Sequence, residues 1–276
     1  MRPRYRIGGF STIGGTPMFS YHSLASATLA MRRTIPAPHQ LWDAINPVTM
    51  VRELVTLNRR EHLLLGSMLT ASVIAFAFQR DYSTIGWIGL LTSFATAFNL
   101  ILVDRGRLTN YGWGLISTST WLVIAFHNRL IGDISSQLFY FIAQFVGIAV
   151  WHQSIAASQN DAVVPRRLTN TMVIWAIGFS LLLYGANVAL SHALHGNQIY
   201  LDASLLVLGV IGQILMTYGY RSQWVAWLIL DVINVIIWAV QLRHGGAAAL
   251  SMLVLQISTL INGLYGAYLW FRPQTA

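Results

Sequence analysis

The fold is constrained most by a series of hydrophobic segments, each close to the length of a membrane-spanning helix. A helix needs about 20 apolar residues to cross the hydrocarbon core of a bilayer. Charged residues make up only 9% of the chain, whereas soluble domains carry about 25%. We therefore predict an all-α integral membrane protein with about eight transmembrane helices. The segments are 63–79, 84–103, 111–127, 137–155, 169–192, 201–218, 222–241 and 248–271.

The arginines predict the orientation of these segments. All 17 basic residues are arginines, and they lie singly or in pairs, which is not the pattern of a nucleic-acid-binding surface. Loops rich in arginine face the cytoplasm, and the opposite side keeps only Arg80, Arg129 and Arg243. We expect an even number of spans and both termini in the cytoplasm. The arginines assigned to the cytoplasmic side are Arg52, Arg59, Arg60, Arg105, Arg107, Arg166, Arg167, Arg221 and Arg272.

Residues 1–58 have a different composition. Glycine pairs and several prolines break any long helix there, and the apolar run Leu24–Met31 is too short to span a membrane. The stretch does not match a signal peptide. We expect a disordered or interfacial arm ahead of a transmembrane domain over 59–272. Met31 and Met50 are alternative start sites.

The first candidate site is a polar stripe inside the segment 222–241. Its members are spaced by 4, 3, 4 and 3 residues, which places them on one helical face. Asp231 is the one carboxylate that we expect well inside a hydrophobic segment, where a charge costs roughly 2.5–3.5 kcal/mol and usually faces a polar cavity. Aromatic rings alternating with an acid and amides suit a flat, polar or cationic ligand. The stripe consists of Trp227, Asp231, Asn234, Trp238 and Gln241.

A matching stripe occupies the segment 137–155. Its spacings of 3, 4, 3 and 4 residues again place the members on one face. An amide at mid-span is costly without a partner, so Gln144 is a second candidate for ligand binding. The stripe consists of Gln137, Tyr140, Gln144, Gly147 and Trp151.

Two further amides, Asn99 and Asn262, also fall inside hydrophobic segments. The alternative interpretation of all these amides is that they bridge neighbouring helices, as polar side chains often do in membranes. Tryptophans near segment ends favour a different role. We expect Trp87, Trp151 and Trp270 to be anchors at the membrane interface rather than ligand contacts.

The chain also contains a weak internal repeat. The pattern Gly-x-x-x-Trp ends both the fourth and the eighth segments, at an offset of 119 residues. A shift of 117 residues adds three matched pairs, namely Trp121 with Trp238, Ser117 with Asn234, and Gly114 with Asp231.

This repeat predicts two halves of three helices each in the same orientation. The halves are about 84–155 and 201–271, with 169–192 as a connecting helix and the first segment as an addition. Transporters built from parallel repeats place their binding site at the interface between the repeats. We therefore expect the two stripes to face one cavity.

Enzymatic signatures are absent from the sequence. It has no cysteine, no Gly-x-Ser-x-Gly element, no phosphate-binding loop and no dinucleotide fingerprint. The histidines fall at or beyond segment ends, and none pairs with a carboxylate at metal-ligand spacing. We expect neither an enzyme nor a resident metal or cofactor. Without an ATP site, transport must use a gradient or trapping of the product.

Several motifs resemble one family, the PnuC vitamin transporters. The stretch Arg107–Ser117 is similar to the family's (K/R)-x-x-N-Y-x-x-G-L element, and Leu138–Trp151 resembles the helix that follows it and closes in Gly-x-x-x-Trp. A third block combines Asp202-Ala-Ser, Ile214-Leu-Met-Thr217 and Tyr220-Arg-Ser-Gln-Trp-Val-Ala-Trp227. The resemblance covers about residues 63–272.

The resemblance implies a 1+3+1+3 arrangement like that of the SWEET sugar transporters, a homotrimer and a location in the bacterial cytoplasmic membrane. It implies facilitated diffusion of nicotinamide riboside, with intracellular trapping by a cytoplasmic riboside kinase. Related branches carry thiamine, riboflavin or deoxynucleosides. The chain departs from the family at Gln223 or Ser222, where glutamate is frequent before the first tryptophan of the block, and at Asp231, where some members have asparagine. A carboxylate there favours a cationic ring.

We accordingly predict a substrate site between the third and fourth and the seventh and eighth segments. Trp121 or Trp227 stacks the base, and Asp231 offsets a positive ring or accepts ribose hydroxyls. The amides bind the carboxamide and the sugar. The predicted substrate-binding residues are Trp121, Tyr140, Gln144, Trp224, Trp227, Asp231, Asn234 and Asn262. Two rival functions remain, a proton-coupled carrier that titrates Asp231 and a sugar carrier on the same fold.

Overall fold

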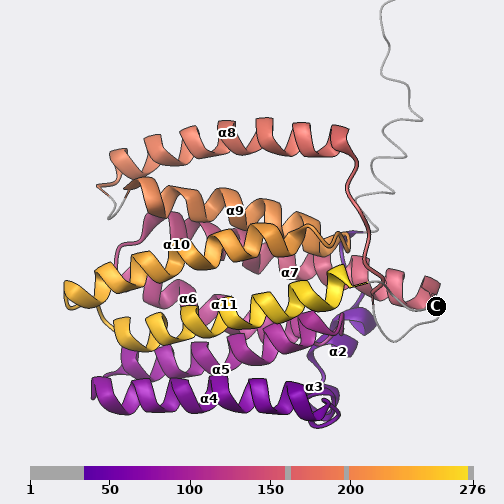
Figure 1. The fold of residues 1–276 in the computed structure, drawn as a ribbon, viewed down its shortest axis with the longest axis horizontal. Helices are drawn as coiled ribbons and strands as arrows, with labels where there is room; N and C mark the ends of the chain where they lie inside the picture. Colours follow the sequence, from indigo (N-terminus) through magenta and orange to yellow (C-terminus); the bar gives the residue numbers. More distant parts are fainter. Residues whose placement is uncertain (1–33, 159–162, 196–198, 273–276) are drawn as a thin grey trace, which may run out of the picture. The chain divides into compact units, whose positions relative to one another are not determined.

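The computed structural model describes residues 34–158, 163–195 and 199–272, and these residues form two short and eight long α-helices (Figure 1). The expectations for residues 1–33 lie outside the described residues. The helices are α2 (Pro38–Ile45), α3 (Pro47–Val55), α4 (Arg59–Gln79), α5 (Thr84–Asp104), α6 (Asn110–His127), α7 (Ile131–Ser158), α8 (Asn170–Ala193), α9 (Ile199–Thr217), α10 (Gln223–Arg243) and α11 (Ala249–Phe271).

Each long helix corresponds to one of the hydrophobic segments in the sequence. Seven helices within the described residues are long and apolar enough to cross a membrane, and α6 is the long helix that does not reach this hydropathy. α6 has 18 residues, several of them hydroxyl-bearing, and it packs between α5 and α7. The chain is thus a multi-pass helical membrane protein, and the long helix of lowest hydropathy packs between two others.

The helix α7 begins at Ile131, six residues before the segment that the sequence predicts. Two serines interrupt the apolar pattern at this point and make the start look like a loop. In the structure each serine hydroxyl donates to a carbonyl one turn earlier, Ser135 to Ile131 at 2.8 Å and Ser136 to Gly132 at 2.7 Å. Such bonds let serine sit inside a helix, and they place Asp133 in the first turn of α7.

Residues 38–55, which belong to the predicted arm, form the helices α2 and α3. Pro38 and Pro47 occupy the first helical positions, where the missing N–H of proline costs nothing. The side chain of Asn46 caps α3 by accepting from the backbone of Val48 at 3.0 Å. Ala44 is fully buried, so α2 packs against the bundle and the expected disorder does not extend to it.

Six of the long helices form a closed ring. Neighbours around the ring are α5, α6, α7, α9, α10 and α11, and α11 returns to contact α5. The predicted halves therefore meet at two seams, α7 with α9 and α11 with α5. The helix α4 packs outside against α5 and α11, and α8 packs outside against α9 and, more weakly, α7. The helix before each half thus occupies a corresponding place.

Two tryptophan side chains cross these seams in the same way. The indole nitrogen Nε1 of Trp151 on α7 donates to the carbonyl of Met216 on α9 at 3.2 Å. Nε1 of Trp270 on α11 donates to the carbonyl of Asp104 on α5 at 3.1 Å. Both indoles are buried. The expectation that these two tryptophans anchor the membrane interface is therefore wrong, because both indoles point into the bundle and donate to backbone carbonyls of the opposite half.

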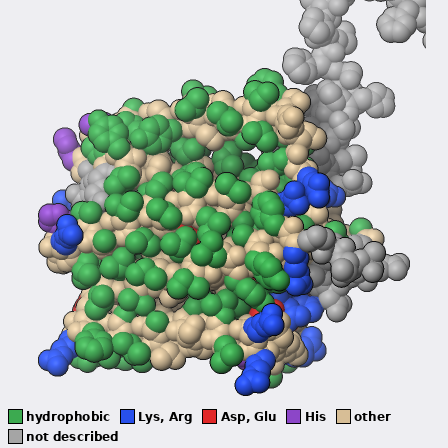
Figure 2. Space-filling view, in the orientation of Figure 1, with side chains coloured by type: hydrophobic (Ala, Val, Ile, Leu, Met, Phe, Trp, Pro, Cys, Tyr) green, Lys and Arg blue, Asp and Glu red, His purple; other side chains and the backbone are tan. Residues whose placement is uncertain are grey.

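Most arginines gather at one end of the bundle, the end where α4, α6, α8 and α10 begin, and apolar side chains cover the face between the ends (Figure 2). We call this the arginine-rich end. Arg80, Arg129 and Arg243 lie at the opposite end. Exposed apolar side chains such as Trp175 and Leu182 on α8 fit a surface in contact with lipid rather than with water.

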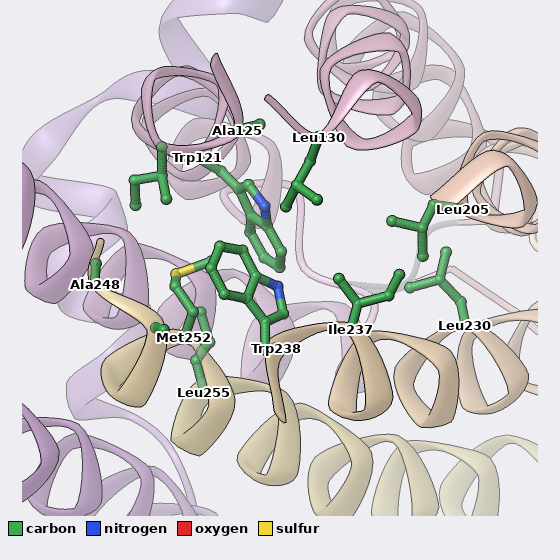
Figure 3. Packing of buried hydrophobic residues seen from close by; sticks show 12 residues of the cluster. Trp121, Ala125, Leu130, Leu205, Leu230, Ile237, Trp238, Ala248, Met252 and Leu255 are labelled. Carbon is green, nitrogen blue, oxygen red and sulfur yellow. The ribbon is translucent and has the colours of Figure 1, made fainter. Parts of the chain in front are cut away.

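Two hydrophobic clusters fill the ring toward its two ends. One lies at the arginine-rich end and includes Tyr111, Trp151, Trp224 and Trp270. The other lies toward the opposite end and brings together Trp121 and Trp238, with Met252 beside them (Figure 3). The space between the two clusters holds the polar residues of the candidate site.

Candidate functional site

A cavity lies inside the six-helix ring, between the two hydrophobic clusters. All six ring helices contribute to its wall, so it lies where the two halves meet. Seven of the eight predicted substrate-binding residues line it, and Asn262 is the exception. The seven are Trp121, Tyr140, Gln144, Trp224, Trp227, Asp231 and Asn234.

Two aromatic rings from opposite halves form one wall of the cavity. Trp227 on α10 and Tyr140 on α7 have ring centroids 5.8 Å apart and an interplanar angle of 52°. Two glycines on α9 make room for them. A Cβ on Gly209 would lie 1.7 Å from the Tyr140 hydroxyl, and one on Gly212 would lie 3.0 Å from the Trp227 ring. The positions of both rings therefore depend on the absence of side chains on this face of α9.

Asp231 lies one helical turn beyond Trp227 on α10. Its side chain is buried, with 8% of the residue exposed. Thr259 on α11 donates its hydroxyl to Oδ1 at 3.3 Å, and Oδ2 faces the backbone of Gly263. Asn234 follows after three residues on the same face and is also buried. Of the five members of the predicted stripe, Trp227, Asp231 and Asn234 line the cavity, whereas Trp238 and Gln241 do not.

The first half presents Gln144 to the cavity. Gln144 on α7 is packed against Gly114 on α6, where a Cβ would lie 2.7 Å from its Oε1 atom. Asn99 lines the same cavity, but its amide donates to the carbonyl of Asn110 at 2.8 Å. Asn99 thus bridges α5 and α6, as the alternative interpretation of the amides proposes. Ser117 likewise bonds Thr96 across these helices at 2.6 Å.

A second carboxylate in the cavity was missed by the sequence analysis. Asp133 lines the cavity and is 2% exposed. Its Oδ2 atom accepts from Nε1 of Trp121 at 2.8 Å, and its Oδ1 atom accepts from Nε2 of Gln137 at 3.3 Å. The expectation that Asp231 is the only acid within the spans is therefore wrong. The signal that was available is the spacing of four residues between Asp133 and Gln137.

Asn262 lies outside the cavity, where its side chain is hydrogen-bonded to another buried acid. Its Nδ2 atom donates to Oδ1 of Asp104 at 3.3 Å, and Asn262 itself is fully buried. Asp104 is the last residue of α5. The amide therefore links α11 to α5 across the seam between the halves.

Several buried polar atoms around the cavity have no hydrogen-bond partner among the described residues. Buried polar groups are normally satisfied, so these atoms are available to bond a ligand or a water. They include both donors and acceptors, and they lie on both halves. These atoms are the hydroxyl of Tyr140, Oε1 of Gln144, Nε2 of Gln213, Nε1 of Trp224, Oδ1 of Asn234 and Nε2 of Gln256.

Of the acidic and basic residue types, only acids are found in the described wall of the cavity. Asp133 and Asp231 are its only ionisable acids, and no arginine or histidine is among the described residues of the wall. An aromatic wall, unsatisfied amides and two carboxylates together suit a flat molecule with hydrogen-bonding groups and a positive charge. Within the described residues no cluster of three histidine, cysteine or acidic side chains is arranged to hold a metal ion.

Comparison with known proteins gives consistent results. The family model described as nicotinamide mononucleotide transporter matches residues 86–272. The nicotinamide riboside transporter PnuC of Neisseria mucosa is 25% identical over 208 residues, covering 74% of this chain and 78% of that protein. The PnuC protein of Haemophilus influenzae is 25% identical over 193 residues, covering 67% and 80%. The Escherichia coli protein of that name is 27% identical over 216 residues, covering 68% and 86%.

A solved structure shares the fold. The crystal structure of the vitamin B3 transporter PnuC superimposes with a TM-score of 0.68 at 25% sequence identity, covering 78% of this chain and 91% of that chain. The matched region of the family model contains all six ring helices except the first two residues of α5. The cavity therefore lies entirely within the part of the chain that the family model matches.

Proposed function

Because this chain belongs to the nicotinamide mononucleotide transporter family, we propose that it carries nicotinamide riboside across a membrane. Three relatives are named as nicotinamide riboside transporters, and each of them matches two thirds or more of this chain's length. The observation that carries the proposal is the cavity itself, in which Trp227 and Tyr140 form an aromatic wall beside Asp231. Nicotinamide riboside is a flat cationic ring joined to a neutral sugar, and this wall matches both parts.

The charge of the cavity favours the riboside over the mononucleotide in the family's name. A phosphate group would bring about −1.5 to −2 charges close to Asp133 and Asp231, with no basic residue among the described lining to pair with it. An unpaired buried charge is strongly destabilising. The riboside, with one positive charge, meets opposite charges instead.

Each lining residue has a distinct role in the proposed complex. Trp227 and Tyr140 hold the pyridinium ring by stacking and cation–π contacts, and Asp231 lies one turn away to offset its charge. Gln144 and Asn234 offer unsatisfied carbonyl oxygens, which suit the amide N–H of the carboxamide and the ribose hydroxyls. Trp121 and Trp224 close the two ends of the site.

Transport proceeds by alternating access, with the two three-helix halves moving against each other around the cavity. The parallel repeat of the SWEET proteins is supported by the matched contacts of Trp151 and Trp270 across the two seams. Eight spans, including α6, put the arginine-rich end and both termini in the cytoplasm. The assembly is a homotrimer in the bacterial cytoplasmic membrane.

Net uptake is facilitated diffusion, and a cytoplasmic riboside kinase traps the cargo by phosphorylation. The acidic cavity supports trapping by phosphorylation, because the phosphorylated product does not fit the cavity and cannot leave through it. Thiamine is the first alternative cargo, since it is also a cationic aromatic molecule. Riboflavin and deoxynucleosides are neutral and leave the acids without a counter-charge.

A proton-coupled carrier is the second candidate. It is favoured by one observation, that Asp231 is buried and that, within the part of the chain that the structure describes, Thr259 is the one residue that donates to its carboxylate. This function predicts that a proton gradient drives uptake, whereas facilitated diffusion does not depend on one.

Uptake by purified protein in liposomes separates these functions. We expect labelled nicotinamide riboside to equilibrate without a proton gradient, and to accumulate only when a riboside kinase and ATP are enclosed. Accumulation driven by an imposed proton gradient without kinase would support the proton-coupled carrier. Failure to move the riboside under either condition would overturn the proposed cargo.

A further inference from the structure

A second hollow lies at the arginine-rich end of the bundle, where α4 begins and where α5 and α11 end. We call it the arginine groove. Four arginines from three separate segments line it, two at the start of α4, one directly after α5 and one directly after α11. They are Arg59, Arg60, Arg105 and Arg272. Segments that are far apart in the sequence thus bring their basic side chains to one place.

The arginine groove carries an excess of positive charge. Its two acids, Glu61 and Asp104, are buried, and Glu61 is paired with Arg105 at 2.9 Å. The other three arginines of the groove are exposed, and none of them forms an ion pair with an acid among the described residues. Four arginines outnumber two acids whatever the protonation of those acids, so the groove attracts an anion.

An exposed apolar stripe runs along α11 and ends at the arginine groove. Its members are spaced by 4, 3 and 4 residues, and Arg272 follows Tyr268 after 4 more, which places them all on one helical face. On the neighbouring helix α4, Leu63 lies one turn beyond Arg60 and is 66% exposed. In Figure 2 the arginines at this end adjoin apolar side chains. The stripe consists of Ile257, Ile261, Leu264 and Tyr268.

Arginines at this end also have a topological use, because loops rich in arginine stay on the cytoplasmic side. That role depends on their number and not on their convergence, and Arg52 and Arg167 serve it without lining the groove. Guanidinium groups bind phosphate oxygens in a bidentate manner, and an exposed apolar stripe accepts acyl chains. A positive groove at the end of such a stripe therefore matches an amphiphile with an anionic head.

We propose that the arginine groove binds an anionic phospholipid, whose phosphate lies among Arg59, Arg60 and Arg272 and whose acyl chains lie along the apolar stripe of α11. The inference goes beyond the proposed function and does not depend on the identity of the cargo. The groove joins α5 of the first half to α11 of the second, at the seam where Trp270 donates to the carbonyl of Asp104 at 3.1 Å. A bound lipid therefore stabilises this seam.

The test measures thermal stability of the purified full-length chain in detergent with added lipid. Phosphatidylglycerol is compared with phosphatidylcholine, which has the same acyl chains and a headgroup without net charge. At equal mole fraction, we expect phosphatidylglycerol to raise the melting midpoint by about 3 °C or more above the value in phosphatidylcholine. Glycerol phosphate, which has the phosphate without acyl chains, should give a much smaller shift. A full shift with glycerol phosphate would overturn the lipid as the ligand.

Two double variants make the result specific to the groove. Arg60→Gln/Arg272→Gln removes one guanidinium from α4 and one from the end of α11, and should weaken the apparent affinity for phosphatidylglycerol by about tenfold or more. Arg52→Gln/Arg167→Gln removes the same charge from the same end but outside the groove, and should keep the full preference for phosphatidylglycerol.

Two results would overturn the proposal. One is a wild-type protein that is stabilised equally by the two lipids, and the other is an equal loss of preference in the two double variants. The second result would show a general attraction of anionic lipid to the arginine-rich end. If Arg60→Gln/Arg272→Gln does not fold, the two single substitutions are measured instead. Each should lower the preference for phosphatidylglycerol, and an unchanged preference in both would refute the site.

Discussion

Trp227 of α10 and Tyr140 of α7 face each other across the boundary between the two halves of the ring, with their ring centroids 5.8 Å apart. Each half therefore supplies one of the two rings of the aromatic wall. A ligand held between or beside these rings contacts both halves at once. Rearrangement of the halves would then change the site itself, which is what alternating access requires.

The first prediction concerns the tryptophan of this pair. Trp227→Ala removes the larger ring of the wall and should weaken binding of nicotinamide riboside by at least about tenfold, or roughly 1.4 kcal/mol. Trp227→Phe keeps an aromatic face and should lose less. Both variants are compared by titration calorimetry, with a thermal melt to verify folding. Equal affinities for the alanine variant and the wild type would exclude stacking on Trp227.

The second prediction uses the space that glycine leaves beside Tyr140. In Gly209→Ala the new Cβ would lie 1.7 Å from the Tyr140 hydroxyl, so the ring must move and the aromatic wall is disrupted. We expect a loss of affinity of about tenfold. Gly178→Ala on α8 is the matched control, because a Cβ there meets nothing within 4 Å. Similar behaviour of the two variants would show that the tyrosine position does not matter.

The third prediction separates charge recognition from proton coupling at Asp231. Asp231→Asn keeps the shape and the bond from Thr259 but removes the charge, so it should weaken binding of the cationic riboside by about tenfold. Uptake into liposomes should remain insensitive to a proton gradient in wild type and variant alike. An uncoupled variant that binds normally would instead identify Asp231 as a proton carrier.

The fourth prediction concerns Trp151 and Trp270, whose indoles make matching hydrogen bonds across the two seams at the arginine-rich end. Trp270→Phe removes the hydrogen bond to the carbonyl of Asp104, and Trp151→Phe removes its counterpart to Met216. Each lost bond is worth about 1 kcal/mol. We expect each variant to favour opening of the cavity toward this end, and the double variant to favour it more.

The native chain has no cysteine, which makes that opening measurable. A single cysteine at Thr118, which lines the cavity, can be labelled by an impermeant thiol reagent added at the arginine-rich end. Labelling should become faster in the order wild type, single variant, double variant. An unchanged rate would show that these indoles do not hold the seams closed.

The helices were predictable from the sequence because apolar segments of spanning length leave few alternatives. The polar stripe on α10 was also predictable, since Trp227, Asp231 and Asn234 repeat at helical spacing and all three line the cavity. What spacing alone does not reveal is which polar groups satisfy each other. Asn262 also falls inside a hydrophobic segment, but its amide donates to Asp104, which is distant in sequence.

Asp133 was missed for a local reason. Ser135 and Ser136 lower the apolar character of this region, and only the serine-to-carbonyl bonds in the folded helix show that α7 already includes it. Trp151 and Trp270 were misassigned for a similar reason. A tryptophan near a segment end fits both an interface anchor and a seam contact, and the acceptor that decides between them lies on another helix.

The central claim is that the cavity binds the cationic nicotinamide riboside in preference to its phosphorylated form, nicotinamide mononucleotide. Its most direct test is equilibrium binding to the purified protein, followed by tryptophan fluorescence, of nicotinamide riboside, nicotinamide mononucleotide, thiamine, riboflavin and a deoxynucleoside. We predict a micromolar dissociation constant for the riboside, about −8 kcal/mol, and binding of the mononucleotide that is weaker by about a hundredfold or more. Equal or tighter binding of the mononucleotide, or binding of a neutral nucleoside in preference to the riboside, would contradict it.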